Sequence, residues 1–344
     1  MVSCGSPMTV TMQDIARSLN VSVVTVSKVL RNTGNISAAT RQRVLQRAKQ
    51  LHYQTNWIAR SLVTRRTFTI GLLLPDFTHP FFAQVAKAAA EACRPHGYHV
   101  VISYFEEDPQ LERSEANFLL ARQVDGLIIA SAQKPGTSEL FRAIRKHRVP
   151  FVLIDRPMRG VKASFVGVSN QAIGTLGTTH LIEVGCQRIA HLRGPKEAGI
   201  AAGRMEGYCK ALRNFGISMR PNYVLEAGYR DETGYAAMQK LLRVRPRPDA
   251  VFCYNDPVAI GAMKAISEAG LDIPNDVAVV GAGNVHYSDV LAVPLTTVDQ
   301  GAAEIGRRAA ELLLQETGGN RKPPNKNVLI PPRLVVRRST QRNR

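Results

Sequence analysis

The apolar positions near the start of the chain follow a helical period in two short segments that a polar turn separates. The apolar stripes are Ile15, Ala16 and Leu19 in the first segment, and Val26, Val29 and Leu30 in the second. Thr11 stands three residues before Asp14, the spacing of a capping box, and Ser22 is a good N-cap for the second helix. The pattern predicts a helix-turn-helix, which places side chains of its second helix on DNA base edges. An ordinary helical hairpin has the same pattern and remains an alternative.

Two further helices are predicted before the pattern changes. Ser37 begins a helix through SAATRQRVLQRAKQLHY, whose apolar stripe consists of Val44, Leu45, Ala48 and Leu51. Three short helices around a small core make a compact headpiece. A two-turn helix is predicted over Trp57–Val63, with Asn56 as its cap. A helix this short is marginal alone, so we expect it to form only when it is docked.

From Phe68 the chain alternates between buried apolar strands and amphipathic helices. The first set of strands is predicted at FTIGLLLPD, HVVISYF, DGLIIAS and PFVLID. The second set is predicted at ASFVGVS, RIAHLRG, YVLEAG, AVFCYND, VAVVGAG and LTTVDQ, before a last helix over about Ala302 to Gln315 and the closing VLIPPRLVVRRS. Continuous apolar runs are typical of parallel strands with both faces buried. The alternation predicts an α/β core of two doubly wound parallel-sheet subdomains with a cleft between them.

Charge is distributed unevenly along the 344 residues, whose net charge is +18. Residues 1–66 contain ten Lys and Arg and one acid, a net charge of +9, and residues 321–344 contain eight basic residues and no acid. The segment 67–320 is nearly neutral at +1. A basic N-terminal module on a neutral body indicates binding to a phosphate backbone. We interpret the basic C-terminal end as a solvated tail.

Motifs for other chemistries are missing from the sequence. The cysteines Cys4, Cys93, Cys186, Cys209 and Cys253 are odd in number and widely spaced, as reduced thiols of a cytosolic protein are. There is no signal-peptide pattern and no run of about 18 apolar residues. There is also no Walker loop, GxSxG, HExxH or GxGxxG after the first strand. We therefore expect a soluble, cytoplasmic protein that is not an enzyme and has no metal and no cofactor.

Taken together, these motifs resemble those of the lactose/galactose repressor (LacI/GalR) family of bacterial transcription regulators over essentially the whole chain. The headpiece motifs are TMQDIARSLNVSVVTVSKVL and ISAATRQRVLQRAKQLHYQTNWIARSL, and the core motifs are IGLLLPDFTHPFF, VDGLI, GCQRIAHLRGP, AAGRMEGY, YNDPVAIGAM, IPNDVAVVGAGN and PLTTVDQ. The resemblance implies a periplasmic-binding-protein-like core. It divides the chain into a headpiece (9–55), a hinge helix and linker (56–67), an effector-binding and dimerisation core of interleaved subdomains (68–339) and a basic tail (340–344).

The resemblance assigns DNA contacts to the headpiece. Val23, Val24 and Lys28 take the base-contacting positions, where valine packs on a thymine methyl and lysine reaches guanine O6/N7. The residues expected to hold phosphates are Thr11, Thr25, Ser27, Asn35 and Thr40.

The resemblance also assigns DNA contacts to the hinge. Asn56 begins the hinge helix, Ala59 faces the minor groove and Leu62 inserts at a central base step, which kinks the duplex. Thr55 stands where the family usually has proline, so we expect the start of this hinge to be less ordered before DNA binds.

An effector site is implied in the core. The expected contact residues are Asp76, Phe81, Phe82 and Asp155 from the first subdomain, and Arg204, Tyr229, Asn255 and Asp256 from the second. Aromatic faces with carboxylate and guanidinium groups suit a polyhydroxylated small molecule. Structural ion pairs that involve Asp155, Arg204 and Asp256 are the alternative.

Departures from the family pattern leave the effector open among a sugar, a sugar phosphate, a sugar acid and something less polar. Gly283 stands where the family commonly has aspartate, and Ala198 and Ile200 stand where relatives bring polar contacts. His286 and Tyr287 are candidates to replace the missing group.

The sequence thus predicts a sequence-specific regulator, a repressor, that binds a pseudo-palindromic DNA operator as a homodimer under the control of a sugar-like effector. A soluble solute-binding protein without regulatory DNA binding is the alternative, since the core alone would fit it. The headpiece and the missing signal peptide argue against that alternative. A sugar-handling enzyme with the same fold is a third reading, because fold does not determine function.

Overall fold

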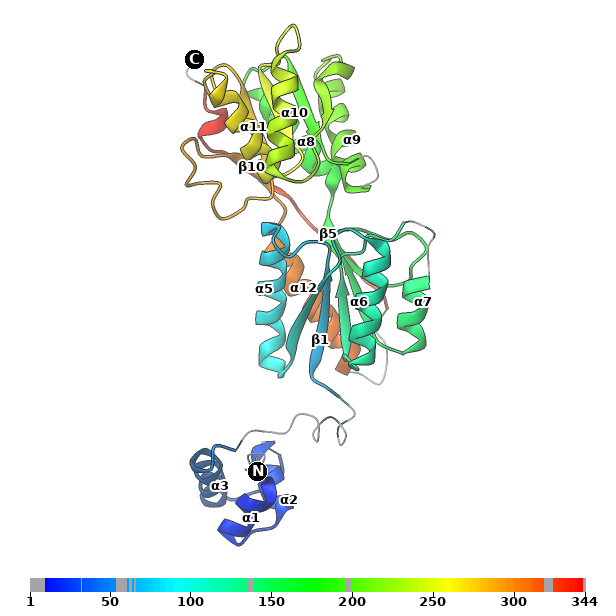
Figure 1. Cartoon of the computed structure of the whole chain (residues 1–344), viewed down its shortest axis with the longest axis vertical. Helices are drawn as coiled ribbons and strands as arrows, with labels where there is room; N and C mark the ends of the chain where they lie inside the picture. Colours follow the sequence, from blue (N-terminus) through cyan, green and yellow to red (C-terminus); the bar gives the residue numbers. More distant parts are fainter. Residues whose placement is uncertain are drawn as a thin grey trace, which may run out of the picture. The chain divides into compact units, whose positions relative to one another are not determined.

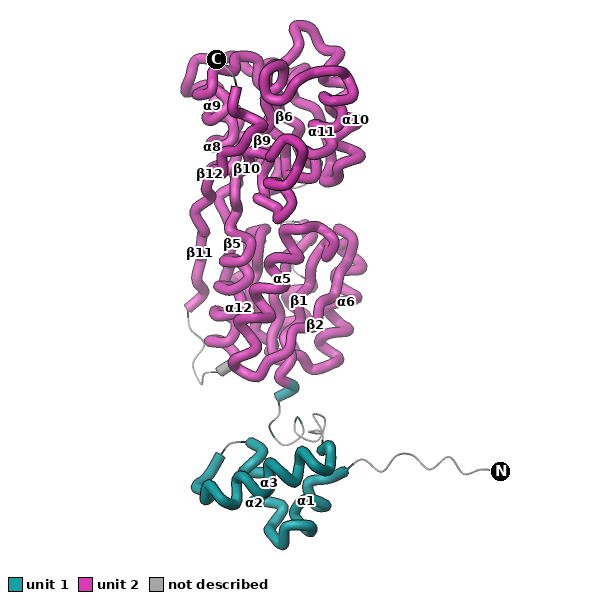
Figure 2. Tube along the Cα trace, turned by 90° about the vertical axis from the view of Figure 1, so that its left-hand side faces the viewer, with its two compact units in different colours: residues 1–67 teal, residues 68–344 magenta. Residues whose placement is uncertain are grey.

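The computed structural model of the chain divides into two compact units, residues 1–67 and 68–344 (Figure 2). It describes residues 10–31, 33–53, 61, 64, 66–134, 136, 139–195, 199–318 and 324–342. The positions Thr55, Asn56, Ala59, Leu62 and Ala198 lie outside the described residues. No helix in these ranges is long and apolar enough to cross a membrane.

The first unit is built from three helices, α1 (Met12–Leu19), α2 (Val23–Leu30) and α3 (Ala38–Gln50). Each begins at the predicted cap, because the side chains of Thr11, Ser22 and Ser37 accept the backbone N–H three residues further on. Their shared core is small and consists of Ile15, Ala16, Val26, Val29, Val44 and Ala48. Asn20 ends α1 in the left-handed conformation, which produces the tight turn into α2.

The first lobe of the second unit is a parallel sheet in the order β11-β5-β4-β3-β1-β2 (Figure 1). Its strands are β1 (Thr69–Leu74), β2 (His99–Tyr104), β3 (Gly126–Ile129), β4 (Phe151–Ile154), β5 (Ser164–Val168) and β11 (Asn327–Ile330). Its helices are α5 (Pro80–Cys93), η1 (Arg94–His96), α6 (Pro109–Ala121), α7 (Glu139–Lys146) and α12 (Ala302–Gly318). Helices α5 and α12 cover one face of the sheet, and α6 and α7 cover the other.

The second lobe repeats this arrangement in the order β12-β10-β9-β8-β6-β7. Its strands are β6 (Ile189–Arg193), β7 (Val224–Glu226), β8 (Ala250–Cys253), β9 (Ala278–Ala282), β10 (Thr296–Asp299) and β12 (Arg333–Val335). Its helices are α8 (Asn170–Glu183), α9 (Gly199–Asn214), η2 (Pro221–Tyr223), α10 (Asp231–Leu242), α11 (Asp256–Glu268) and η3 (Arg338–Thr340). Strand β12 is antiparallel to β10, while the other strand pairs in this sheet are parallel.

The chain passes between the lobes after β5, after β10 and after β11. The prediction that ASFVGVS opens the second set of strands is wrong, because β5 pairs with β4 and β11 in the first sheet. The closing segment VLIPPRLVV supplies β11 to the first sheet and β12 to the second. An apolar run predicts a strand but contains no information on which sheet receives it.

The C-terminal end packs on the second lobe as far as Arg342. Thr340 is buried, and its Oγ1 lies 2.8 Å from His180 Nε2. Arg342 donates hydrogen bonds to the backbone carbonyls of Pro274 and Asp249. The prediction of a solvated tail is therefore wrong for these residues, because their polar groups make hydrogen bonds to the second lobe.

Candidate functional site

The start of α2 presents two valines to solvent. Ser22 Oγ accepts the Thr25 N–H at 3.1 Å and so begins the helix at Val23. Val24 is 60% exposed and Val23 is 39% exposed, whereas Val26 is fully buried in the headpiece core. The cap therefore determines which valines enter the headpiece core and which remain available to a partner.

The predicted phosphate-binding residues differ in the donors they have left. The Thr11 hydroxyl donates to Asp14 Oδ2 at 2.7 Å as part of the capping box, so that proton is not available to a phosphate. Thr40 Oγ1 instead accepts from Ser37 Oγ at 2.9 Å, and its own proton has no acceptor among the described residues. Asn35 is exposed, and Thr25 and Ser27 are half-buried. Thr25 Oγ1 lies 2.9 Å from Ser22 Oγ, so the geometry favours Ser27, Asn35 and Thr40 over Thr11.

Lys28 is exposed and its stem lies beside the turn that follows α2. A Cβ added at Gly34 would lie 3.1 Å from Lys28 Cδ, and Gly34 has a φ of +74°. Glycine at this position therefore allows the turn and leaves room for the lysine stem.

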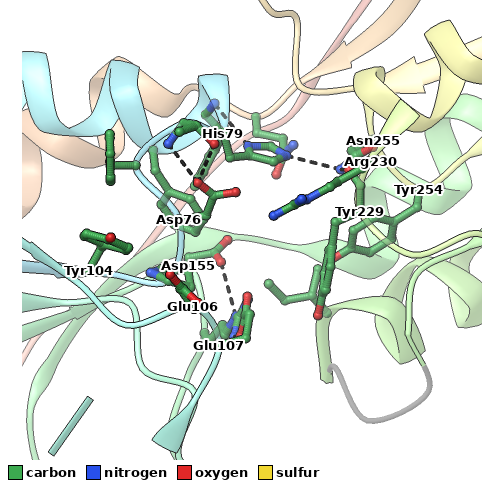
Figure 3. Close-up of a pocket in the computed structure, with 18 of the residues that line it drawn as sticks. Asp76, His79, Tyr104, Glu106, Glu107, Asp155, Tyr229, Arg230, Tyr254 and Asn255 are labelled. Atoms are coloured by element: carbon green, nitrogen blue, oxygen red, sulfur yellow. Dashed lines mark hydrogen bonds and ion pairs between the residues drawn. The ribbon is translucent and has the colours of Figure 1, made fainter. Parts of the chain in front are cut away.

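A cavity of about 640 Å³ lies between the two lobes of the core (Figure 3). The first lobe lines it with residues that follow β1, β2 and β4 and with the start of α5. Open parallel sheets bind ligands at these carboxyl ends of their strands. The polar lining residues are Asp76, Thr78, His79, Tyr104, Glu106, Glu107, Asp155, Arg156, Arg204, Tyr229, Arg230, Tyr254, Asn255 and Gln300, and the apolar ones are Pro75, Phe77, Phe81, Phe82 and Ile200.

Most of the residues predicted to contact an effector meet at this cavity. They are Asp76, Phe81, Phe82, Asp155, Arg204, Tyr229 and Asn255. Asp256 does not line it, which corrects its assignment as a contact residue. Its carboxylate is fully buried and accepts hydrogen bonds from the Val285 N–H, the Ser288 hydroxyl and the Thr297 hydroxyl. Asp256, at the start of α11, therefore holds the segment that follows β9 and strand β10 within the second lobe.

Asp155 differs from Asp256 in its lack of donors. Its side chain accepts no hydrogen bond from the described residues, and its partner is Arg156, whose Nε lies 3.6 Å from Asp155 Oδ2. Burial raises the pKa of Asp155, against the nearby charges of Arg156 and Arg204, which lower it. The backbone of Asp155 has a φ of +63°, an uncommon conformation that aspartate tolerates and that clusters at functional sites.

Arg204 is 3% exposed, and its partners are neutral. It donates to Asn170 Oδ1 at 3.1 Å, to Gln300 Oε1 at 2.9 Å and to the backbone carbonyl of Tyr254. Its guanidinium also lies 4.6 Å from the centre of the Tyr254 ring. A guanidinium has five N–H donors, so two remain for an acceptor in the cavity.

Arg156 and Glu107 form an ion pair that lines another part of the first cavity. Both guanidinium Nη atoms of Arg156 donate to the carboxylate of Glu107. Burial alone would lower the pKa of Arg156, but Glu107 and Asp155 raise it on balance. Glu106 and Glu107 have φ angles of +51° and +60°, so the backbone after β2 is strained where it meets the cavity.

A second cavity of about 900 Å³ adjoins the first and shares Asp76, Thr78, His79, Tyr229 and Arg230 with it. His286 and Tyr287 line this second cavity and not the first. They therefore lie beside the adjoining cavity, and their role as replacements for the carboxylate that the family commonly has at Gly283 stays a prediction.

Sequence reasoning missed several lining residues, above all His79, Glu106, Glu107, Arg156 and Gln300. All of them stand within three residues of the end of a predicted strand or the start of a predicted helix. That position at the carboxyl edge of a parallel sheet was the signal that could have found them.

The fold and the cavity define a class of protein, in which a helix-turn-helix headpiece is joined to a two-lobed core with room for a small molecule. Residues 11–56 match the family described as "Bacterial regulatory proteins, lacI family", and residues 178–340 match "Periplasmic binding protein-like domain". A PurR transcriptional repressor of Mannheimia succiniciproducens is 32% identical over 96% of this chain and 99% of that protein. A ribose operon repressor of Halalkalibacterium halodurans is 34% identical over 96% and 97%.

Solved structures agree with these relatives. The Lac repressor dimer bound to operator and the anti-inducer ONPF is 30% identical, with a TM-score of 0.84 over 96% of this chain and 99% of that one. A LacI-family regulator from Enterococcus faecium with bound ribose has a TM-score of 0.72 and 26% identity over 79% and 98%. The chain belongs to the lacI family of bacterial regulatory proteins. The predicted family, fold class and regulatory function are confirmed.

Proposed function

We propose that this cytoplasmic protein is a repressor that binds a pseudo-palindromic operator as a homodimer, and that a neutral polyhydroxylated molecule in the core cavity controls its DNA affinity. One observation carries the effector part: Asp155, without hydrogen-bond donors from the described residues, and Arg204, with unused donors, line the same cavity. The capped headpiece supports the DNA part. Relatives that are repressors, one of them a dimer on its operator, support both.

The headpiece would contact bases through Val23, Val24 and Lys28. The exposed valine methyls suit the C5-methyl group of thymine, and Lys28 suits guanine O6/N7. Thr25, Ser27, Asn35 and Thr40 would hold phosphates, which carry no sequence information but set the register.

The hinge positions remain proposals that rest on the sequence alone. Asn56 would begin a hinge helix, Ala59 would face the minor groove, and Leu62 would insert between the two central base pairs together with its counterpart in the partner. Such a wedge unstacks a base step and bends the DNA.

The hydrogen-bonding groups of the cavity favour a neutral ligand over a sugar phosphate or a sugar acid. A hydroxyl group donates to Asp155 and accepts from Arg204, so vicinal hydroxyls satisfy both residues. An anionic group would instead lie beside the Asp155 carboxylate, and Arg156 is already paired with Glu107. Arg230 is the lining cation that an anionic ligand would have to use. The rings of Phe81, Phe82 and Tyr229 offer apolar faces for a sugar ring.

Ligand and DNA would be coupled through the lobes. A ligand held by both lobes changes their separation or rotation, and that change alters the spacing of the two hinges in the dimer. By linkage, the effector changes DNA affinity by the same factor as DNA changes effector affinity.

A thermal-shift panel tests the effector proposal. The panel holds neutral monosaccharides and disaccharides beside their phosphates and the corresponding sugar acids. A ligand that binds only the folded protein raises the melting temperature, and we expect the neutral members to do so. Stronger stabilisation by the phosphates or the acids would contradict the neutral class, and no shift with any member would contradict a sugar effector.

Selection of binding sites from random duplex DNA tests the DNA proposal. We expect pseudo-palindromic sites and an affinity that falls steeply with salt, with a log–log slope of about −0.9 for each phosphate contact. Stabilisation by a sugar without enrichment of any DNA site would instead support the solute-binding alternative.

A further inference from the structure

His79 makes a direct bond between the two lobes at the cavity. It belongs to the first lobe, where it stands at the N-cap position of α5, and its Nε2 lies 3.2 Å from Nδ2 of Asn255 in the second lobe (Figure 3). The ring lines both the effector cavity and the second cavity. It therefore separates the two cavities, which would become one if the lobes opened.

The orientation of the Asn255 amide is determined by its other partners. Its Oδ1 accepts the Val258 N–H at 2.9 Å as the N-cap of α11, and its Nδ2 donates to the Tyr229 carbonyl at 2.9 Å. A flipped amide would place donors against the Val258 N–H and an acceptor against the carbonyl. The second proton of Nδ2 thus faces His79, and the contact is a hydrogen bond in the tautomer whose Nε2 accepts this proton.

The other ring nitrogen also faces a donor. Nδ1 of His79 lies 3.3 Å from the Phe81 backbone N–H. A neutral imidazole has one accepting nitrogen, so it satisfies one of the two donors. An imidazolium has an N–H on both nitrogens and satisfies neither, so a protonated His79 is incompatible with this contact.

The surroundings of His79 agree with a neutral ring. Burial lowers its pKa to about 4, although Asp76 acts in the opposite direction. The charged and titratable groups around it are Asp76, Glu107 and Arg156 of the first lobe, Arg204, Tyr229 and Arg230 of the second, and Lys87, Asp231, Glu232, His286 and Tyr287 at the second cavity. Asp76 is the main charge that favours a proton on the ring, and burial outweighs it.

We propose that His79 is a proton-sensitive latch, which holds the two lobes together through Asn255 when it is neutral and releases them when it takes up a proton. Opening would place the ring in water, where an imidazole has a pKa of about 6.5. At pH values between the low pKa of the ring in the latched form and its higher pKa in water, the latched form binds fewer protons than the open form. Acid therefore favours opening, by about tenfold at pH 5.5 relative to neutral pH.

The latch should also make the affinity for the effector depend on pH. A ligand that contacts both lobes binds best when they are together, so its affinity should fall as the pH drops below about 6.5. This consequence rests on the proposed effector site, whereas the latch itself does not.

The first experiment measures the titration of His79 in the full chain by NMR with 13Cε1-labelled histidine. The His79→Asn variant identifies the signal, and asparagine retains the N-cap of α5. We expect the signal to titrate near pH 4 in the wild type. Asn255→Ser keeps the cap of α11 but removes the amide donor, so the lobes should open more readily. The ring of His79 then becomes hydrated, and its pKa should rise toward 6.5. A wild-type pKa near 6.5, or no change in Asn255→Ser, would overturn the latch.

The second experiment measures lobe separation with spin labels on Lys87→Cys and Glu232→Cys, in a Cys4→Ser, Cys209→Ser background. We expect the distance to lengthen between pH 7.5 and 5.5 with His79 present and to be independent of pH in His79→Asn. A pH-dependent distance in His79→Asn would assign opening to another group and overturn the proposal. Neither experiment uses operator or sugar, so failure here leaves the proposed function untouched.

Discussion

Asp155 in the first lobe and Asp256 in the second are both buried, but they differ in the hydrogen bonds that their carboxylates accept. The two residues are 5% and 0% exposed, and burial raises the pKa of both carboxyl groups. Asp256 accepts three hydrogen bonds within its lobe, whereas the Asp155 carboxylate accepts none from the described residues. A buried carboxylate with its own donors stabilises the fold, and one without them is available to a ligand.

The largest effect should follow from removing the satisfied carboxylate. We expect Asp256→Ala to lower the free energy of unfolding by about 3 kcal/mol or more, because stranded buried donors cost about 1–3 kcal/mol each. Urea denaturation measures this loss, with the exposed Asp289→Ala as a control that should stay within about 0.5 kcal/mol of wild type. A loss of unfolding free energy as small as that of the control would contradict the structural role of Asp256.

The unsatisfied carboxylate should show the opposite pattern. We expect Asp155→Asn to lower the free energy of unfolding less than Asp256→Ala, because it strands no hydrogen-bond donor of the described residues and Arg156 keeps its pairing with Glu107. Affinity for any sugar that stabilises the wild type should fall about ten- to a hundredfold, since hydrogen bonds to charged groups contribute roughly 1.5–3 kcal/mol. Calorimetric titration of the variant measures this. Unchanged sugar affinity together with lost stability would reverse the roles of the two aspartates.

Local chemistry made most of the fold predictable from the sequence. The caps at Thr11, Ser22 and Ser37 act over three residues, and each begins its helix where predicted. The parallel strands were predictable because both of their faces are buried. The assignment of β5 to a sheet was not, because pairing partners far away in the sequence decide it.

The cavity was only partly predictable for the same reason. Asp155 and Asp256 each stand beside the end of a strand, so position alone does not separate them. The difference arises from Ser288 and Thr297, which reach Asp256 from 32 and 41 residues away. The His79–Asn255 contact joins residues 176 apart, and no local pattern contains it.

The headpiece offers the same contrast between occupied and available groups. Val23 and Val24 are exposed without a partner in the described core, so we expect the double change to asparagine to alter which operator is preferred. Each affected base pair should change by about 1–3 kcal/mol. Competition between operator variants with and without thymine methyls measures the shift. An unchanged ranking of the operators would mean that the valines do not contact bases.

The smallest expected effect separates Thr11 from Thr40. The Thr11 hydroxyl is used within the capping box, so Thr11→Ala should cost the headpiece about 1 kcal/mol of stability and leave the operator affinity of the folded protein unchanged. The Thr40 hydroxyl proton has no acceptor among the residues that the structure describes, so Thr40→Ala should weaken binding to all DNA sequences to a similar extent, by a few-fold, because a phosphate contact carries no base information. Hydrogen exchange of α1 measures the first effect, and fluorescence anisotropy with specific and random duplexes measures the second. A contradicting result would be weaker DNA binding by Thr11→Ala while α1 stays fully protected from exchange. It would mean that the Thr11 hydroxyl of the wild type leaves Asp14 and contacts the operator, so that a hydrogen bond within the headpiece does not exclude a DNA contact.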